Sequence, residues 1–208
     1  FTFHNAAALS RQWEHRRLDL LTGLRTGRYP FLVATVEGLL QRTIPPATLE
    51  GCCRTLKSGG AQDLNELAED LSAAGYVRCE QVEGAGQFAL RGGILDVFSP
   101  GMEAPVRAEF FGDEIDAMGV FDPATQRRTE NIDTAFLLPA AEVLPQLAPG
   151  GGAGLSKKLS KLAARALQNG NKALAETLEQ DGEAIAQGRT FPAADRYLSL
   201  IYPELTCG

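Results

Sequence analysis

The alternation of hydrophobic and polar positions changes its period along the chain. Between about residues 76 and 138, apolar residues alternate with polar ones in short runs such as "VRAEFF", and glycines or prolines separate the runs. Period-two alternation is typical of strands with one buried face, and such short breaks require mostly antiparallel neighbours. The sequence therefore predicts strand segments at 76–83, 86–98, 104–112, 113–122 and 132–139.

Apolar residues recur at three- and four-residue spacing on either side of this region, which predicts helices. The best-defined helix follows Asp63, whose carboxylate can cap the first turn, and ends at Gly75. Leu64, Leu67 and Leu71 share one face of it. Further helices are predicted over residues 5–24, in two stretches between 155 and 188, and over a short stretch that ends at Pro203.

Residues Phe31 to Val36 form a continuous apolar run that leads into a few helical residues. This is the pattern of a buried parallel strand in an α/β layer. Because such a strand needs neighbours in its sheet, we expect part of that sheet to lie outside this sequence.

The glycine-rich segment "APGGGAGLSKKLS" at residues 148–160 invites comparison with a phosphate-binding loop. A Walker A loop requires GxxxxGK followed by Ser or Thr, so that the lysine directly follows the last glycine. Here Leu155 and Ser156 precede Lys157, and no buried strand precedes the segment. We therefore interpret the segment as a flexible joint and expect no nucleotide or other cofactor.

Charge divides the chain into three blocks, with +4 over residues 1–60, −11 over 61–149 and +1 over 150–208. An acidic surface repels phosphates, so we expect no direct nucleic-acid binding from residues 61–149 and favour a protein partner with a basic face. Trp13 is the only tryptophan and lies on a predicted amphipathic helix, so we expect it to be a core residue and not an aromatic surface on which bases stack.

The overall composition, 44% hydrophobic and 22% charged over 208 residues, is that of a globular protein. No signal peptide and no bilayer-length apolar run is evident, so we expect a cytoplasmic protein with no membrane partner. The four cysteines have no CxxC spacing, and His4 and His15 lie outside ligand spacing of a cysteine pair. These patterns predict reduced thiols and no metal site.

One candidate site in the acidic block is the cluster of Asp113, Glu114 and Asp116. Carboxylates could ligate a divalent cation, which would make the chain a small metal-dependent hydrolase. However, successive residues of a strand point to opposite faces, and no further catalytic group stands nearby in the sequence. We therefore favour a solvated hairpin corner and keep the hydrolase as an alternative.

A second candidate centres on Arg91 in "FALRGGILDVF". If the apolar residues before it face the core, Arg91 faces the other side of the sheet, and Gly92-Gly93 leaves that surface uncluttered. Arg78 and Glu109 also lie in strand segments, and two guanidiniums with a carboxylate would suit recognition of a partner's carboxylates. The open alternative is plain solvated strand faces, with Gly92-Gly93 as a β-bulge.

The motifs "FALRGGILDVF", "EFFGDEID" and "FDPATQR" occur in this order within residues 75–140. In this they resemble the UvrB-like module of bacterial transcription-repair coupling factors. The resemblance implies a docking module without chemistry of its own, which recruits UvrA, the damage-recognition ATPase of nucleotide excision repair, to RNA polymerase stalled at DNA damage. The corresponding fragment of UvrB stays an alternative, although UvrB carries RGD where this chain has Arg91-Gly92-Gly93, and its long aromatic-rich hairpin is absent between Leu49 and Gly75.

The resemblance also assigns the UvrA contacts to Arg78, Arg91 and Glu109, and we include Phe98 from the end of the first motif among the partner-binding residues. Ala89 stands where UvrB has a further arginine, which implies one contact fewer. RNA polymerase and double-stranded DNA would bind elsewhere in the whole protein, whose ATP-driven motor the resemblance places far downstream.

The resulting fold class is α+β with partial α/β. By resemblance, residues 1–60 are the end of an incomplete, degenerate RecA-like lobe. Residues 61–149 are expected to form a small α+β domain with a mostly antiparallel sheet. Residues 150–208 are expected to be a linker followed by helices that return toward the next lobe.

Overall fold

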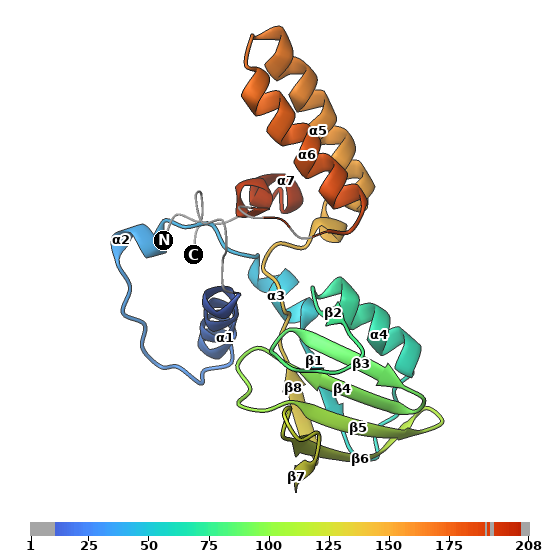
Figure 1. The fold of residues 1–208 in the computed structure, drawn as a ribbon. Helices are drawn as coiled ribbons and strands as arrows, with labels where there is room; N and C mark the ends of the chain where they lie inside the picture. Colours follow the sequence, from blue (N-terminus) through green and yellow to red (C-terminus); the bar gives the residue numbers. More distant parts are fainter. Residues whose placement is uncertain (1–10, 190, 192–193, 205–208) are drawn as a thin grey trace. The chain divides into compact units, whose positions relative to one another are not determined.

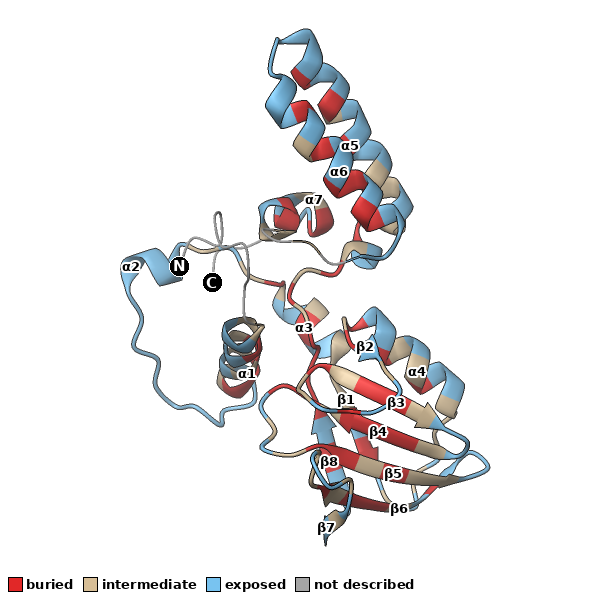
Figure 2. Ribbon diagram, viewed as in Figure 1, coloured by how far each residue is buried: buried red, intermediate tan, exposed pale blue. Residues whose placement is uncertain are grey.

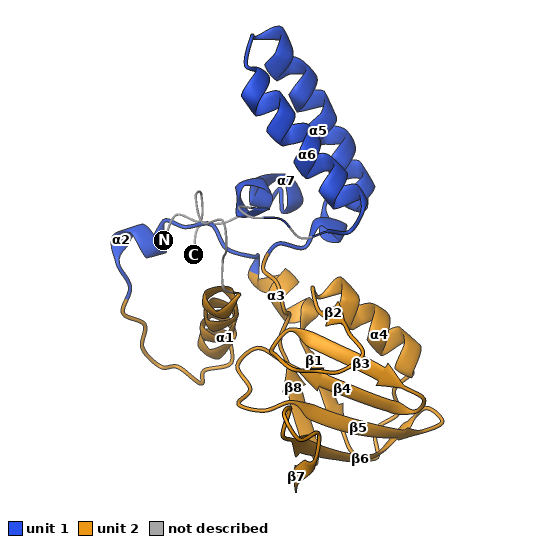
Figure 3. Cartoon of the chain, in the orientation of Figure 1, with its two compact units in different colours: residues 1–9, 34–45, 143–208 blue, residues 10–33, 46–142 orange. Residues whose placement is uncertain are grey.

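The computed structural model describes residues 11–189, 191 and 194–204. Contacts divide the chain into two compact units (Figures 1 and 3). We call residues 10–33 and 46–142 the sheet unit, and residues 1–9, 34–45 and 143–208 the helical unit. The sheet unit contains α1 (Gln12–Arg25), α3 (Pro46–Cys52), β1 (Arg54–Lys57), α4 (Leu64–Ala73), β2 (Val77–Arg78), β3 (Gln87–Arg91), β4 (Ile94–Phe98), β5 (Val106–Phe111), β6 (Glu114–Phe121), β7 (Arg128–Asn131) and β8 (Thr134–Leu137).

Six strands of the sheet unit form one sheet in the order β2-β3-β4-β5-β6-β7, and β1 pairs with β8 in a separate two-stranded sheet. Every strand pair is antiparallel except β2 with β3, which run parallel. The prediction of an α+β fold with a mostly antiparallel sheet is therefore confirmed. Of the predicted segment 76–83, only Val77–Arg78 is a strand.

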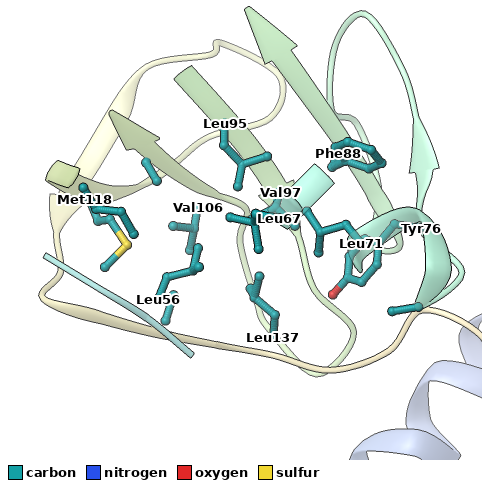
Figure 4. Packing of buried hydrophobic residues seen from close by; sticks show 14 of the residues in the cluster. Leu56, Leu67, Leu71, Tyr76, Phe88, Leu95, Val97, Val106, Met118 and Leu137 are labelled. Atoms are coloured by element: carbon teal, nitrogen blue, oxygen red, sulfur yellow. The ribbon is translucent and has the colours of Figure 1, made fainter. Parts of the chain in front are cut away.

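The main hydrophobic core lies on one face of the six-stranded sheet, which we call the core face. Side chains of that face pack against leucines of α4, β1 and β8, as Figure 4 shows for Leu67, Leu71, Leu56 and Leu137. The opposite face, which we call the outer face, carries only a small apolar cluster at Val82, Ala89 and Phe121. The outer face is therefore the side of the sheet that is available to carry a polar surface.

α4 forms as its sequence predicts. One oxygen of Asp63 accepts hydrogen bonds from the backbone N–H groups of Asn65 and Glu66, both at 2.8 Å. This cap satisfies two of the N–H groups that a helix start leaves without partners. Leu67 and Leu71 are fully buried, so the predicted apolar face is the one that packs on the sheet.

Gly92 and Gly93 form the two-residue loop of a hairpin between β3 and β4, in which Arg91 pairs with Ile94. Gly92 has φ +60°, a backbone conformation that two-residue hairpin loops use and glycine adopts without strain. The interpretation of this pair as a β-bulge within one strand is therefore wrong. The tight reversal fixes the register of β4 and hence places Asp96 beside Ala89.

The apolar run at 31–36 is not a buried strand. Residues 31–35 have no regular structure, and the side chains of Phe31 and Val33 are 89% and 98% exposed. An apolar run becomes a buried strand only where other strands supply hydrogen-bond partners, and no described strand pairs with this one. The expected buried strand is therefore wrong for the described structure, and the RecA-like lobe stays a prediction.

Trp13 is 53% exposed, so the expectation that it is a core residue is wrong. The buried side of α1 is a narrow stripe at His15, Leu18 and Thr22, and Trp13 lies outside it. The guanidinium of Arg16 stacks over the Trp13 ring at 5.1 Å from its centroid. Residues 5–10 of the predicted helix lie outside the described residues.

The helical unit contains two long helices that pack along each other (Figures 1 and 2). α5 begins at Gly151, so the glycine-rich segment is not a joint from there on, and this prediction is wrong. Helix–helix packing of Leu155 and Leu159 outweighs the poor helix propensity of glycine. The elements are α2 (Val36–Leu39), the 3₁₀ helix η2 (Pro145–Leu147), α5 (Gly151–Gln168), α6 (Lys172–Ala186), the 3₁₀ helix η3 (Ala194–Tyr197) and α7 (Leu198–Ile201).

Helices of the described residues are all too short or too polar to cross a bilayer.

Buried His15 makes the stability of the sheet unit depend on pH. Its Nε2–H donates to the Ala140 carbonyl oxygen at 3.0 Å. Burial lowers the pKa of His15 below 6.5, and nearby Arg11 acts in the same direction, while the hydrogen bond to Ala140 acts against them. The unfolded chain therefore binds a proton at a higher pH than the folded chain, so stability falls as the pH drops below about 6.5.

We expect His15→Gln, which can keep an N–H donor at this position, to reduce that pH dependence. Thermal unfolding at pH 7.5 and pH 5.5 checks it, with the drop in melting temperature smaller in the variant than in the original chain. An equal drop in both proteins would show that His15 does not carry the effect.

Candidate functional site

Five charged side chains converge on the outer face, and we call them the outer-face charge cluster. The cross-strand register brings them together, because β4 pairs Asp96 with Arg107 and Ile94 with Glu109 of β5. The members of the cluster are Arg91, Asp96, Arg107, Glu109 and Arg128.

Asp96 is the centre of the cluster, and its side chain is only 1% exposed. One of its oxygens accepts from Nε of Arg107 at 2.6 Å, and the other accepts from Nη2 of Arg107 at 2.8 Å. Arg91 also donates to Asp96 through its Nη2. A buried carboxylate requires such partners, because an uncompensated charge away from water is strongly destabilising.

Arg107 is itself held from three sides. Its guanidinium lies over the Phe121 ring at 4.6 Å from the centroid, and its Nη1 donates to the carbonyl oxygen of Gln126 at 3.3 Å. The hydrogen bond with Asp96 raises the pKa of Arg107, so the guanidinium stays charged. Gln126 has φ +60°, which is rare outside glycine, and its amide secures the loop by donating to the carbonyl oxygen of Pro123 at 2.7 Å.

Glu109 and Arg128 form the third ion pair of the cluster, with Nη2 of Arg128 donating to the carboxylate. Gly119 makes room for Arg128, because a Cβ at Gly119 would lie 2.8 Å from Cδ of Arg128. Phe111 follows two positions after Glu109 on β5 and is 84% exposed. The cluster therefore continues into an exposed aromatic side chain at the end of the sheet.

Of the residues that the sequence singled out, Arg91 and Glu109 belong to this cluster, on β3 and β5 with β4 between them. The Arg91 side chain is 47% exposed, although it is paired with a buried acid. Phe98 is partly buried against the small apolar cluster of the outer face. All three therefore lie on the outer face, with Arg91 and Glu109 accessible.

Arg78 has a different setting. It pairs with Phe88, whose side chain is in the main core, so the register places Arg78 on the core-face side of the edge strand β2. It is exposed and makes no ion pair with any residue that the structure describes. The structure thus does not bring Arg78 and Arg91 together on one face, and the partner-binding role of each stays a prediction.

Sequence reasoning missed Asp96, Arg107 and Arg128. The signal for Asp96 and Arg107 was present, because both alternate with buried residues in "ILDVF" and "VRAEFF". Recognising Gly92-Gly93 as a hairpin loop would have set the β3–β4 register and placed Asp96 near Arg91. Arg128 had no comparable signal, because its place depends on an irregularity in the β6–β7 pairing next to Phe121.

The acidic cluster predicted as a possible metal site does not form one. Asp113, Glu114 and Asp116 are all exposed at the hairpin corner between β5 and β6. Nowhere in the described residues do three His, Cys, Asp or Glu side chains come close enough to hold a metal ion. The hydrolase alternative therefore has no converging carboxylates to rest on.

Comparison with known proteins shows which proteins this chain is similar to. Residues 55–142 match the model of the UvrB interaction domain. The transcription-repair-coupling factor of Myxococcus xanthus is 40% identical over 129 residues, which are 62% of this chain and 11% of that protein. The transcription-repair-coupling factor of Bacillus subtilis is 30% identical over 205 residues, which are 95% of this chain and 17% of that protein.

The UvrABC system protein B of Thermotoga neapolitana is 35% identical over 126 residues, which are 61% of this chain and 19% of that protein. The chain thus spans less than a fifth of the length of these relatives. The match to the domain covers the six-stranded sheet, α4 and the β1–β8 pair, which together present the outer-face charge cluster. Residues 55–142 thus match the UvrB interaction domain, and the chain is similar over most of its length to a part of transcription-repair-coupling factors.

Proposed function

We propose that the chain is a non-catalytic docking module that binds UvrA through the outer face of its six-stranded sheet. The observation that carries this proposal is the half-exposed guanidinium of Arg91, held by the buried carboxylate of Asp96 on an open face. The family match supports it, because the matched domain is described as an interaction domain.

The geometry suits recognition of a carboxylate on the partner. A guanidinium has five N–H donors, and the bond to Asp96 uses a donor on one terminal nitrogen of Arg91, which leaves others for a partner. Because Asp96 already restrains the side chain, less conformational entropy is lost when a partner binds. Arg107 stays behind Arg91 with only 18% of its side chain exposed, so it supports the surface more than it offers contacts.

The rest of the cluster would form the rim of the interface. Glu109 and Arg128 offer one charge of each sign, and Phe111 offers an exposed aromatic ring of the type that often anchors protein interfaces. Arg78 would contribute only if the partner also reaches around the edge strand β2. Ala89, which is buried, supplies no contact in place of the arginine that UvrB has there.

The wider role follows from the relatives' printed names and from the resemblance in the motifs. In this proposal the module recruits UvrA, in the cytoplasm, to RNA polymerase stalled at DNA damage. The contacts with RNA polymerase, and the ATP-driven motor with the double-stranded DNA on which it acts, belong to other parts of the whole protein. The two relatives described as coupling factors include one that matches 95% of the chain, which favours this role over a fragment of UvrB.

A calorimetric titration of the chain with UvrA tests the proposal. We expect binding at 50 mM NaCl that weakens roughly tenfold by 300 mM, because the proposed contacts are charged and partly exposed. Lys57→Gln serves as a control, since Lys57 lies on β1 away from the outer face and its loss should leave the affinity unchanged. No binding at 50 mM, or an affinity that does not change with salt, would contradict the proposal.

A further inference from the structure

α5 carries four exposed cations and no acidic residue along its 18 residues. These cations, which we call the α5 stripe, are Lys157, Lys158, Lys161 and Arg165. The chain as a whole has a net charge of −6, so this helix is an exception to its overall charge.

The four cations lie on one side of the helix. At 3.6 residues per turn they fall within about 100° of its circumference, away from the buried side at Leu155 and Leu159. Lys157, Lys161 and Arg165 follow each other at four-residue spacing, so they form a line about 12 Å long. A straight row of positive charges is therefore presented to solvent.

The stability of the packed helix pair α5 and α6 does not explain this row of charges. Like charges four residues apart destabilise a helix, as do Lys157 with Lys161 and Lys161 with Arg165, and of the four cations only Arg165, in the last turn, is favoured by the helix dipole. None of the four cations makes an ion pair with any residue in the described part of the chain, although α6 carries several acids. The stripe therefore costs stability that a neutral or mixed surface would not.

We propose that the α5 stripe binds the phosphate backbone of duplex DNA without regard to sequence. Duplex DNA carries one negative charge per about 1.7 Å of axis, so a 12 Å row of cations faces several phosphates at once. The exposed positions that border the row on the side of Lys157 are Ser160, Ala164 and Gln168, which are small or polar, while the exposed Leu167 lies about 80° around the helix from Lys157. The row itself therefore holds no aromatic or large apolar anchor for a protein partner, which favours a ligand that is recognised by charge alone.

This proposal concerns the helical unit and is independent of UvrA binding. The expectation that residues 61–149 avoid nucleic acid is unaffected, because α5 lies outside that acidic block.

Fluorescence anisotropy with a labelled 30-base-pair duplex of arbitrary sequence tests the stripe. We expect the chain to bind at 50 mM NaCl and to lose about 40-fold in affinity by 200 mM, as three phosphate contacts would give. The triple variant Lys157→Gln, Lys161→Gln, Arg165→Gln should bind at least tenfold more weakly at 50 mM and show little dependence on salt. Circular dichroism should show unchanged helix content in this variant.

A matched triple neutralisation in the sheet unit, Arg16→Gln, Lys57→Gln, Arg127→Gln, should keep the affinity for the duplex. Absence of binding by the original chain at 50 mM NaCl would overturn the proposal, as would equal binding by the two triple variants. Binding of poly-glutamate with the same affinity as the duplex would overturn the assignment to nucleic acid and indicate an acidic protein partner.

Discussion

Arg107→Ala is expected to destabilise the sheet unit by about 3–5 kcal/mol. The substitution removes two of the three hydrogen bonds that Asp96 receives from guanidiniums, and the carboxylate is too deeply buried for water to replace them. It also removes the stacking of the guanidinium over Phe121 and the bond to Gln126. Urea denaturation followed by circular dichroism measures the loss.

Two further variants make this test specific. Asp96→Asn combined with Arg107→Gln removes both charges, so it should recover a substantial part of the lost stability, because no uncompensated charge stays buried. Arg127→Ala serves as a control, because Arg127 is exposed and lies next to Gln126 in the sequence. It should change stability by less than about 0.5 kcal/mol. A loss below about 1 kcal/mol in Arg107→Ala would mean that Asp96 does not depend on this pair.

β1 and β7 lie outside the predicted strand segments, and no residue of β7 is buried. Strands β3, β4, β5, β6 and β8 could be predicted from the sequence, because each turns apolar residues toward the core. The pairing of β1 with β8 could not, because the strands are 4 residues each and some 80 residues apart, and nothing local in "RTLK" specifies a distant partner. The parallel β2–β3 pair was equally hidden, since β2 has only two residues. Local patterns thus predict most of the strands, whereas pairing depends on the whole fold.

The wrong predictions share a physical cause. The apolar run at 31–36 and Trp13 were both expected to be buried because of residue type, yet burial depends on what packs against a segment. The reverse holds for residues 151–154, where glycine suggested a loop and packing of α5 on α6 gives a helix. Tertiary contacts, which residue type alone does not reveal, decided each of these cases.

Only part of the candidate site could be predicted from the sequence. Arg91 and Glu109 stand out as charges within apolar strands, so alternation alone places them on the outer face. Asp96 was not recognised as a partner of Arg91, because a carboxylate in a strand is expected to face solvent. Only the register of β3, β4 and β5 shows that Asp96 lies between two guanidiniums. Finding the centre of the cluster required the loop at Gly92-Gly93 to be read correctly.

Arg91→Ala is expected to weaken the binding of UvrA at least 30-fold, which corresponds to about 2 kcal/mol. Arg91 is the most exposed arginine of the outer-face charge cluster, so it is the one that a partner reaches first. The chain should stay folded, because Arg107 still donates one hydrogen bond to each oxygen of Asp96. The loss of stability should stay below about 1 kcal/mol. Thermal melting of the variant checks that condition before binding is measured.

Arg78→Ala provides the matched comparison, because it removes the same side chain from the neighbouring strand but from the other side of the sheet. The deciding measurement is therefore the calorimetric dissociation constant of UvrA for Arg91→Ala and Arg78→Ala, each beside the original chain. We expect a loss of at least 30-fold for Arg91→Ala and a clearly smaller loss for Arg78→Ala. Unchanged affinity in a folded Arg91→Ala variant would show that the outer face of the sheet is not where UvrA binds.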